Sequence, residues 1–192
     1  MLKDLITSNV RVKILVLFLS HPKESFHVRD ITRRVGTEIN AVRRELDRLI
    51  KVGLFKREAR GNRVYIRLRS DYPFLGDLLS AFDKEHGLSA NILENEKGLG
   101  KVKMGLVSSE FLQGRISGLE DVDLLLVGTV DLKVLKDIVE KFQEKSGREV
   151  NYSVMGEEEF DFRKKRMDPF IVKVLTQSRI IFIGDSDKNC KL

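Results

Sequence analysis

Apolar residues at helical spacing predict two helices in the first 35 residues. The first helix follows Ser8, whose hydroxyl can accept hydrogen bonds from the open amides of a first turn. It ends before His21 and Pro22, because proline cannot continue a helix. A short extended stretch at residues 26–28 leads into the second helix, residues 28–35, so two short helices open the chain.

A glycine turn separates the second helix from a third. Gly36 stands where a helix end commonly adopts a left-handed residue, and Thr37 is the expected N-cap of the next helix. The third helix is predicted over residues 40–52, with an apolar stripe on one side and a basic polar face on the other. The stripe comprises Ile39, Val42, Leu46, Leu49 and Ile50, and the polar face comprises Asn40, Arg43, Arg44, Asp47, Arg48 and Lys51.

A β-hairpin is predicted directly after the third helix. Residues 54–60 and 63–69 read as two strands, and Gly61 with Asn62 is a typical two-residue turn between them. The tip of this hairpin carries Arg60, Asn62 and Arg63. Three helices followed by a basic hairpin are therefore expected in residues 1–72.

Positive charge is concentrated in this N-terminal part. The chain has a net charge of +6 and a pI near 9.4. Residues 1–72 contain 17 lysines and arginines against 8 carboxylates, whereas residues 73–192 contain 18 against 21. Such asymmetry is typical of a polyanion-binding module joined to a module with a different task.

The order of these elements indicates a duplex-DNA reader. The major groove admits one helix, whose N-terminal half reaches base edges, and a basic hairpin can follow phosphates or enter the minor groove. The predicted DNA-binding residues are Thr37, Asn40, Arg43, Arg44, Arg60, Asn62 and Arg63, and the predicted contacts to the phosphate backbone are Arg11, Arg29, Arg33 and Arg34. Each arginine taken alone also fits a solvated helix face. RNA binding is disfavoured, because the chain has no tryptophan and the hairpin region offers only Phe55 and Tyr65 for stacking.

This N-terminal part resembles the winged helix-turn-helix regulators of the ArsR-like class. The resemblance lies in residues 28–36, residues 41–49, the Val-Gly-Leu of residues 52–54 and the hairpin, or wing. It implies a homodimer on a palindromic operator. Metal sensing, known in part of that class, is not implied, because no cysteine or histidine cluster lies on these helices; His21 and His27 are expected to be surface or packing residues.

The remainder of the chain predicts a linker and a small mixed-sheet module. Helices are expected over residues 74–82 and about 88–96, in a helical linker spanning residues 73–100. The resemblance to the winged-helix regulators implies that the helix after the wing is a dimer contact. Strands at 102–107, 122–127, 150–155 and 180–183 then alternate with helices, among them residues 132–145. The expected fold class is α+β, with a small α/β domain over residues 101–192.

Two carboxylates at Asp121 and Asp123 are the main candidates for chemistry in this second module. If they enter a strand, alternation places both on one face, where a magnesium ion would offset their repulsion. Here the sequence resembles the minimal nucleotidyltransferases, whose pattern is Gly-Ser after a first strand and Asp-x-Asp on the second. Ser108 and Ser109 stand at the Gly-Ser position, and they are the candidate nucleotide-binding residues.

The family pattern is incomplete. The third acid of that family falls near Asn151, although Glu149, expected on the same strand face, would supply a carboxylate. Three readings stay open for Asp121 and Asp123: polar strand-entry residues, binding of Mg²⁺ or a nucleoside triphosphate without turnover, and nucleotide transfer. The leading hypothesis is a transcription regulator with an inactive nucleotidyltransferase-like domain for ligand sensing or partner contact. The alternative is a Mg-dependent nucleotidyltransferase that modifies a partner protein or a small acceptor.

Other features exclude classes of protein. The longest apolar run, residues 14–19, is far shorter than the roughly 18 residues of a membrane span, and no signal-peptide pattern opens the sequence. A cytoplasmic chain without a membrane partner is expected. The single Cys190 is expected to be an incidental thiol, and the second Asp-x-Asp, at Asp185 and Asp187, is given no role because no strand follows it.

Overall fold

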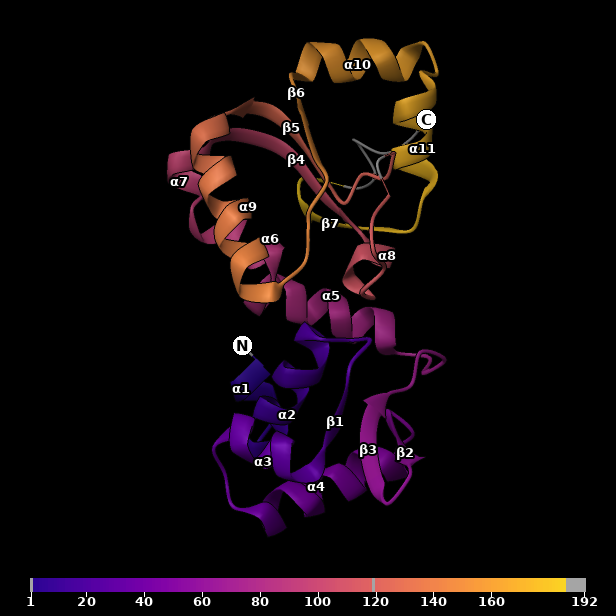
Figure 1. The fold of residues 1–192 in the computed structure, drawn as a ribbon. Helices are drawn as coiled ribbons and strands as arrows, with labels where there is room; N and C mark the ends of the chain where they lie inside the picture. The colour runs from indigo at the N-terminus through magenta and orange to yellow at the C-terminus, as the bar shows by residue number, and fades with distance from the viewer. Residues whose placement is uncertain (1, 119, 186–192) are drawn as a thin grey trace. The chain divides into compact units, whose positions relative to one another are not determined.

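The computed structural model describes residues 2–118 and 120–185 (Figure 1). Within them the chain mixes helices with two small sheets, one of three strands and one of four. It separates into two compact units, residues 1–85 and residues 86–192. The boundary falls inside the region expected to be a linker, because the helix after the hairpin belongs largely to the first unit.

Five helices lie wholly or largely in the first unit: α1 (Leu2–Leu5), α2 (Asn9–Ser20), α3 (Val28–Val35), α4 (Ile39–Lys51) and α5 (Leu75–His86). Ser8 caps α2 as predicted, since its hydroxyl accepts a hydrogen bond from the Arg11 amide at 3.2 Å. Helices α2, α3 and α4 pack against one another around fully buried side chains that include Phe18, Ile31 and Val42.

The turn between α3 and α4 confirms one prediction and corrects another. Gly36 adopts the left-handed conformation at φ 62°, which only glycine tolerates readily. Thr37 is not the N-cap of α4; its hydroxyl instead donates a hydrogen bond to the Val35 carbonyl at 3.4 Å. The helix begins one residue earlier than predicted, at Ile39, so that Glu38 takes the cap position and accepts hydrogen bonds from the amides of Asn40 and Ala41.

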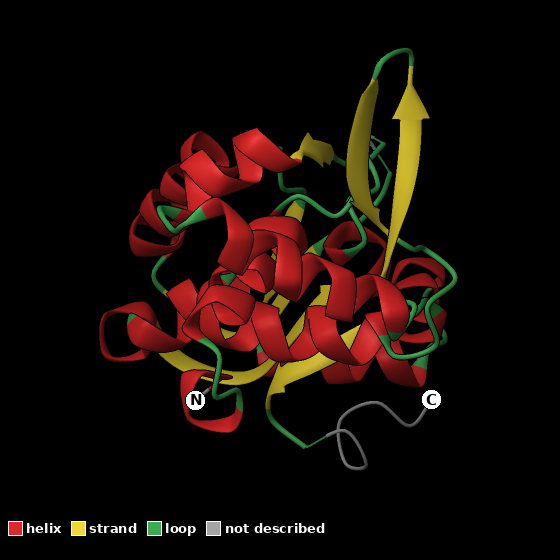
Figure 2. Cartoon of the chain, turned by 90° about the horizontal axis from the view of Figure 1, so that it is seen from below, coloured by secondary structure: helices red, strands yellow, loops and turns green. Residues whose placement is uncertain are grey.

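The first sheet contains the predicted hairpin. Strands β1 (Ser25–His27), β2 (Phe55–Arg60) and β3 (Arg63–Leu68) are arranged in the order β1-β3-β2, and all pairings are antiparallel. Arg60 pairs with Arg63 across a turn in which Gly61 has a φ of 58°. In Figure 2 the loop end of this hairpin projects away from the helices, so its tip residues are open to solvent.

A buried carboxylate joins α2 to α4. Glu45 is 7% exposed and accepts hydrogen bonds from the Arg11 Nε atom and from Arg48, both at 2.8 Å. Burial raises the pKa of the Glu45 carboxyl, but hydrogen bonds from Arg11 and Ser8 lower it by more, so the pKa lies below its ordinary value of 4.5. Glu45 is therefore charged near neutral pH and holds the two helices together.

The second unit is built on a four-stranded mixed sheet. Its strands are β4 (Gly100–Ser108), β5 (Leu124–Val130), β6 (Tyr152–Met155) and β7 (Arg179–Ile183), in the order β6-β5-β4-β7. The β5–β6 pair is parallel, whereas β4 is antiparallel to both of its neighbours. The helices described in this unit are α6 (Leu88–Glu94), α7 (Glu96–Leu99), α8 (Ser109–Leu112), α9 (Leu132–Ser146), α10 (Glu157–Lys165) and α11 (Pro169–Thr176).

Helices cover both faces of this sheet. Leu125 and Val127 of β5 belong to one core cluster with Phe160 of α10 and Ile171 of α11. Because side chains alternate along a strand, Leu124 and Leu126 face the opposite side, and both are fully buried. Figure 1 shows α9 on one side of β4 and β5, and α10 and α11 on the other. Both faces of β5 are therefore buried by apolar packing. Candidate polar sites are expected at the ends of the strands instead.

No helix within residues 2–118 and 120–185 has the length and apolar character that crossing a bilayer requires.

The Glu45 bridge gives a first prediction about stability. We expect Glu45→Gln to lower the free energy of unfolding by about 1–3 kcal/mol, because the amide cannot offer charged oxygens to both guanidiniums. Because the pKa of Glu45 is lowered in the folded chain, its contribution is fully present above pH 4.5 and is lost as the pH falls through the folded value. Urea unfolding at neutral pH and in steps below it should show the wild type and the variant converging in acid.

Glu24→Gln is the matched control, since Glu24 makes an exposed pair with His21 in the same unit. Equal stability of the two variants at neutral pH would contradict the prediction.

Candidate functional site

The first half of α4 presents an exposed basic face. Asn40, Arg43 and Arg44 are all solvent-exposed, while Val42 and Leu46 on the opposite side are buried. Neither Arg43 nor Arg44 forms an ion pair with any residue that the structure describes. These guanidiniums are therefore free to contact a ligand outside the chain.

Glu38 adds a negative charge at the start of this face, and the sequence argument missed it. The pKa of the Glu38 carboxyl is lowered, mainly because the amides of Asn40 and Ala41 donate hydrogen bonds to it. The charges of Arg44 and Arg43 lower it further. The signal was available, because an acidic residue directly before a helix suits its open amides and its dipole. Glu38 therefore offers an acceptor beside the predicted donors of α4.

The hairpin tip contributes a second group of basic residues. Arg63 is exposed and forms no ion pair within the described part of the chain. Arg60 hydrogen-bonds to Glu58 at 3.3 Å and lies over the ring of Tyr65, with 5.2 Å between the guanidinium carbon and the ring centroid. Asn62 is exposed at the turn.

An ion pair links the hairpin to α4. The Arg57 guanidinium on β2 contacts the Asp47 carboxylate on α4 at 2.5 Å. Because both side chains are largely exposed, the pair adds little stability.

The four arginines predicted to contact the phosphate backbone differ in their surroundings. Arg11 is held by the buried carboxylate of Glu45. Arg33 and Arg34 both pair with Asp30, at 2.6 and 3.2 Å. Arg29 is exposed and forms no ion pair with a described residue. Arg29 thus resembles Arg43, Arg44 and Arg63, whereas Arg11 has a role in joining the helices.

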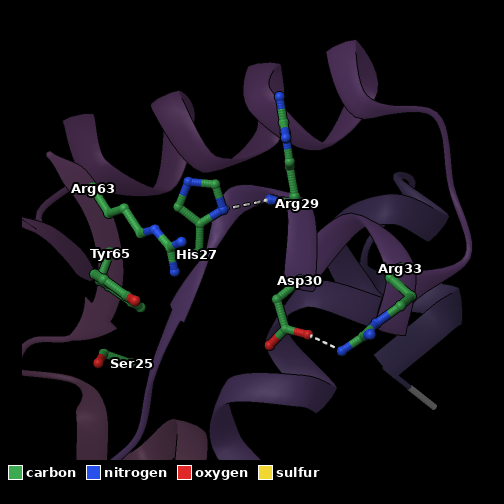
Figure 3. A pocket seen from close by; sticks show the side chains of 7 residues that line it. All are labelled: Ser25, His27, Arg29, Asp30, Arg33, Arg63 and Tyr65. Atoms are coloured by element: carbon green, nitrogen blue, oxygen red, sulfur yellow. Dashed lines mark hydrogen bonds and ion pairs between the residues drawn. The ribbon is translucent and has the colours of Figure 1, made fainter.

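A pocket of about 570 Å³ opens between α3 and the hairpin (Figure 3). Its lining comprises Ser25, His27, Arg29, Asp30, Arg33, Arg63 and Tyr65. Arg29, Arg33 and Arg63 are predicted from sequence as DNA-binding residues, whereas no sequence pattern indicates Ser25, Tyr65 or this role for His27. His27 caps α3, because its Nδ1 atom accepts a hydrogen bond from the Arg29 amide at 3.3 Å. His21 contacts Glu24 at 3.2 Å.

The two serines at the expected nucleotide-binding position make hydrogen bonds within the unit, Ser108 through its hydroxyl and Ser109 through its backbone amide. Ser108 is buried, and its hydroxyl caps α8 by accepting a hydrogen bond from the Phe111 amide at 3.4 Å. The amide of Ser109 donates a hydrogen bond to the Ser178 carbonyl at 2.9 Å. These contacts close the turn after β4 and leave the Ser108 hydroxyl inside the unit.

The placement of Asp121 and Asp123 on one strand face is wrong. Strand β5 begins at Leu124, so both residues precede it and the alternation rule does not apply to them. Asp123 is 2% exposed and accepts hydrogen bonds from the Ser117 hydroxyl at 2.6 Å and the Asn151 amide at 2.8 Å. It fastens the loop before β5 to the segment before β6.

Asp121 lies among positive charges. Its carboxylate accepts a hydrogen bond from the Gly118 amide at 2.9 Å, and it contacts Arg115 at 3.2 Å and Lys173 at 3.8 Å. The Gly118 amide is the largest cause of its lowered pKa, and the charges of Arg115 and Lys173 act in the same direction. Asp121 is therefore already neutralised by side chains of its own unit.

A second pocket, of about 720 Å³, lies beside Asp121. Its lining combines apolar groups with charged and polar residues, namely Glu120, Asp121, Asn151, Tyr152, Ser153 and Lys173. Asn151 precedes β6 and donates a hydrogen bond to the Gly118 carbonyl at 2.7 Å. Glu149 also precedes β6 and is exposed, so its expected place on a strand face is wrong.

These residues do not fit a magnesium ion. Asp123 directs both of its oxygens to donors within the unit, and Asp121 is contacted by two cations that would repel a metal. The described residues contain no group of three or more side chains of the types that ligate metals. Asp187 and Cys190 lie outside the described residues.

The hydrogen bonds of Asp123 give a second stability prediction. We expect Asp123→Asn to lower the free energy of unfolding by about 1–3 kcal/mol, because the amide has one uncharged acceptor oxygen where the carboxylate offers two charged ones to the Ser117 hydroxyl and the Asn151 amide. Thermal unfolding monitored by circular dichroism measures the effect. Asp161→Asn on α10, at an exposed position, is the control, and a destabilisation no larger than that of the control would rule out a structural role for Asp123.

The comparisons with known proteins leave this geometry as the basis for function. Searches of protein-family models, curated proteins and solved structures found no match to the chain. A function is therefore argued from the exposed face of α4, the hairpin and the two pockets.

Proposed function

We propose that this chain is a sequence-specific DNA-binding transcription regulator whose first unit is a winged helix-turn-helix. The observation that carries the proposal is the exposed pair Arg43 and Arg44, which form no ion pair among the described residues and stand in the first half of α4. Helices α3 and α4, joined at Gly36, serve as the helix-turn-helix, and β2 with β3 serves as the wing.

The distribution of ion pairs supports this assignment. Most arginines of the first unit are matched by nearby carboxylates. Those that form no ion pair in the described part of the chain are Arg29, Arg43, Arg44 and Arg63. An arginine without an internal partner is available to fork onto guanine or onto phosphate. All four lie on α3, α4 or the hairpin, the elements proposed to meet DNA.

We further propose that the second unit is a nucleotidyltransferase-like domain that binds a ligand or a partner without catalysing transfer. The support is the motif order along the chain, since Ser108 ends the strand β4 and Ser109 follows it, and Asp121 and Asp123 directly precede the next strand, β5. The neutralised Asp121 and the buried Asp123 argue against a metal-dependent reaction. The pocket beside Asp121 is the proposed ligand site.

The DNA-binding proposal predicts a graded effect of arginine substitutions. Arg43→Ala or Arg44→Ala is expected to weaken binding to the preferred site by about 1–3 kcal/mol and to relax base preference. Arg60→Ala or Arg63→Ala is expected to weaken all sites alike and to lower the salt dependence, since these residues would meet phosphates. Fluorescence anisotropy on specific and scrambled duplexes, over a salt series, measures both effects.

The specific duplex comes from genomic fragments retained on the full chain and then sequenced. We expect a short inverted repeat, because a homodimer would present two copies of α4 to symmetric half-sites. Lys51→Ala is the control, since Lys51 is exposed at the far end of the same helix. No retention at low salt, or equal losses for Lys51→Ala and the two α4 arginine variants, would contradict the proposal.

The alternative, nucleotide transfer, has a direct test. With labelled nucleoside triphosphates and Mg²⁺, we expect no transfer of label to the chain or to added proteins, because the site does not fit the metal. Asp121→Asn is the informative variant, since Asp121 lies at the pocket and is not buried like Asp123. Transfer that disappears in this variant would establish the enzyme and overturn the proposed inactivity.

A further inference from the structure

The pocket of the first unit carries an excess of positive charge. Three guanidiniums, those of Arg29, Arg33 and Arg63, line it together with the single carboxylate of Asp30. That carboxylate is shared between Arg33 and Arg34. Two positive charges on the lining, Arg29 and Arg63, are thus left without an acid among the described residues. An anion is the ligand that would balance them.

Neutral hydrogen-bond donors surround these charges. The Nδ1 atom of His27 accepts a hydrogen bond from the Arg29 amide, so a neutral imidazole carries its proton on Nε2 and can donate from there. The hydroxyls of Ser25 and Tyr65 add two more donors to the lining. In Figure 3 the Arg63 side chain reaches from β3 toward the ring of His27, while Arg29 stands at the start of α3 with its side chain extended away from Asp30 and Tyr65. The donors therefore come from three separate elements.

We propose that this pocket binds the phosphate group of a phosphate ester. Donors carried by β1, α3 and β3 can serve the several acceptor oxygens of a tetrahedral group, and arginine matches phosphate with a forked pair of hydrogen bonds. The volume of about 570 Å³ exceeds that of a bare phosphate and leaves room for the attached sugar or alcohol. The ester is either a nucleotide unit of the DNA backbone or a free phosphorylated small molecule.

The inference rests on the proposed function only if the phosphate belongs to the DNA backbone. If DNA supplies the phosphate, the pocket clamps one backbone position between α3 and the hairpin and fixes the register of α4 in the groove. If a free ester supplies it, the ligand would compete with DNA for Arg29 and Arg63. The charge and the donors of the pocket suit a phosphate in both cases.

The histidines provide a direct probe of occupancy. The chain has only three, His21, His27 and His86, so their Cε1–H signals can be resolved by NMR in the full-length protein. His27→Asn identifies the His27 signal, since asparagine can still cap α3. The probes are dimethyl phosphate, a diester like the DNA backbone, and glycerol phosphate, a monoester. Both are titrated at constant ionic strength, with chloride as the reference anion.

We expect a saturable shift of the His27 signal with at least one phosphate probe and no saturable shift of the His21 signal. Arg29→Gln and Arg63→Gln should each weaken the apparent affinity at least about tenfold. Arg44→Gln is the control, because Arg44 does not line the pocket. Absence of a saturable shift, or a shift that persists unchanged in both pocket variants, would overturn the proposal.

Parallel DNA titrations identify the source of the phosphate. If Arg29→Gln and Arg63→Gln weaken both DNA and probe binding, the pocket holds a backbone phosphate. If they weaken only probe binding, it holds a free ester; either result supports the phosphate site. Failure of the α4 arginine variants to affect DNA binding would instead remove the proposed function and leave the pocket result standing.

Discussion

The exposed face of α4 depends on one buried charge. Glu45 lies on the same side of the helix as Val42, Leu46 and Leu49, and its carboxylate is fastened to Arg11 of α2. A carboxylate can be kept in such a place only when hydrogen bonds and cations satisfy it, so the bridge fixes the rotation of α4 about its axis. With the stripe of Val42, Glu45, Leu46 and Leu49 inward, Arg43 and Arg44 fall on the opposite side, because successive residues are separated by about 100° around a helix. The geometry of the basic face is therefore set from inside the unit.

The same balance of charges separates arginines that hold the fold from those that can bind. In the first unit, acids neutralise arginines locally: Asp30 within α3, Glu45 between α2 and α4, and Asp47 between α4 and β2. A residue neutralised in this way has less to gain from a phosphate, because its carboxylate partner must first be displaced or screened. The distribution of net charge along the chain indicates a polyanion partner. Only the ion pairs show which arginine side chains are available to bind that partner.

Much of the first unit could be predicted from sequence because its signals are local. Apolar spacing, the cap at Ser8, the left-handed Gly36 and the Gly61 turn each act within a few residues, and all are present in the structure. The prediction that Thr37 is the N-cap of α4 is wrong. Thr37 and Glu38 both carry oxygens that can accept from open helix amides, and which of them is the cap depends on where the first turn begins. The pocket at His27 could not be predicted, since it combines β1, α3 and β3, whose contacts arise only on folding.

The second unit shows why an acidic motif alone does not define a metal site. Two aspartates separated by one residue can hold a cation when a strand directs both carboxylates to one open face. Here Asp123 turns inward to Ser117 and the Asn151 amide, while Asp121 meets Arg115 and Lys173. Lys173 lies on α11, far along the chain from Asp121, so no local pattern reveals that pairing. A lysine and an arginine supply the compensating charge that a magnesium ion would otherwise provide, and they do so without the coordination geometry that transfer of a nucleotide requires. What this end of the sheet retains is a pocket with polar groups at its margin, which suits binding rather than turnover.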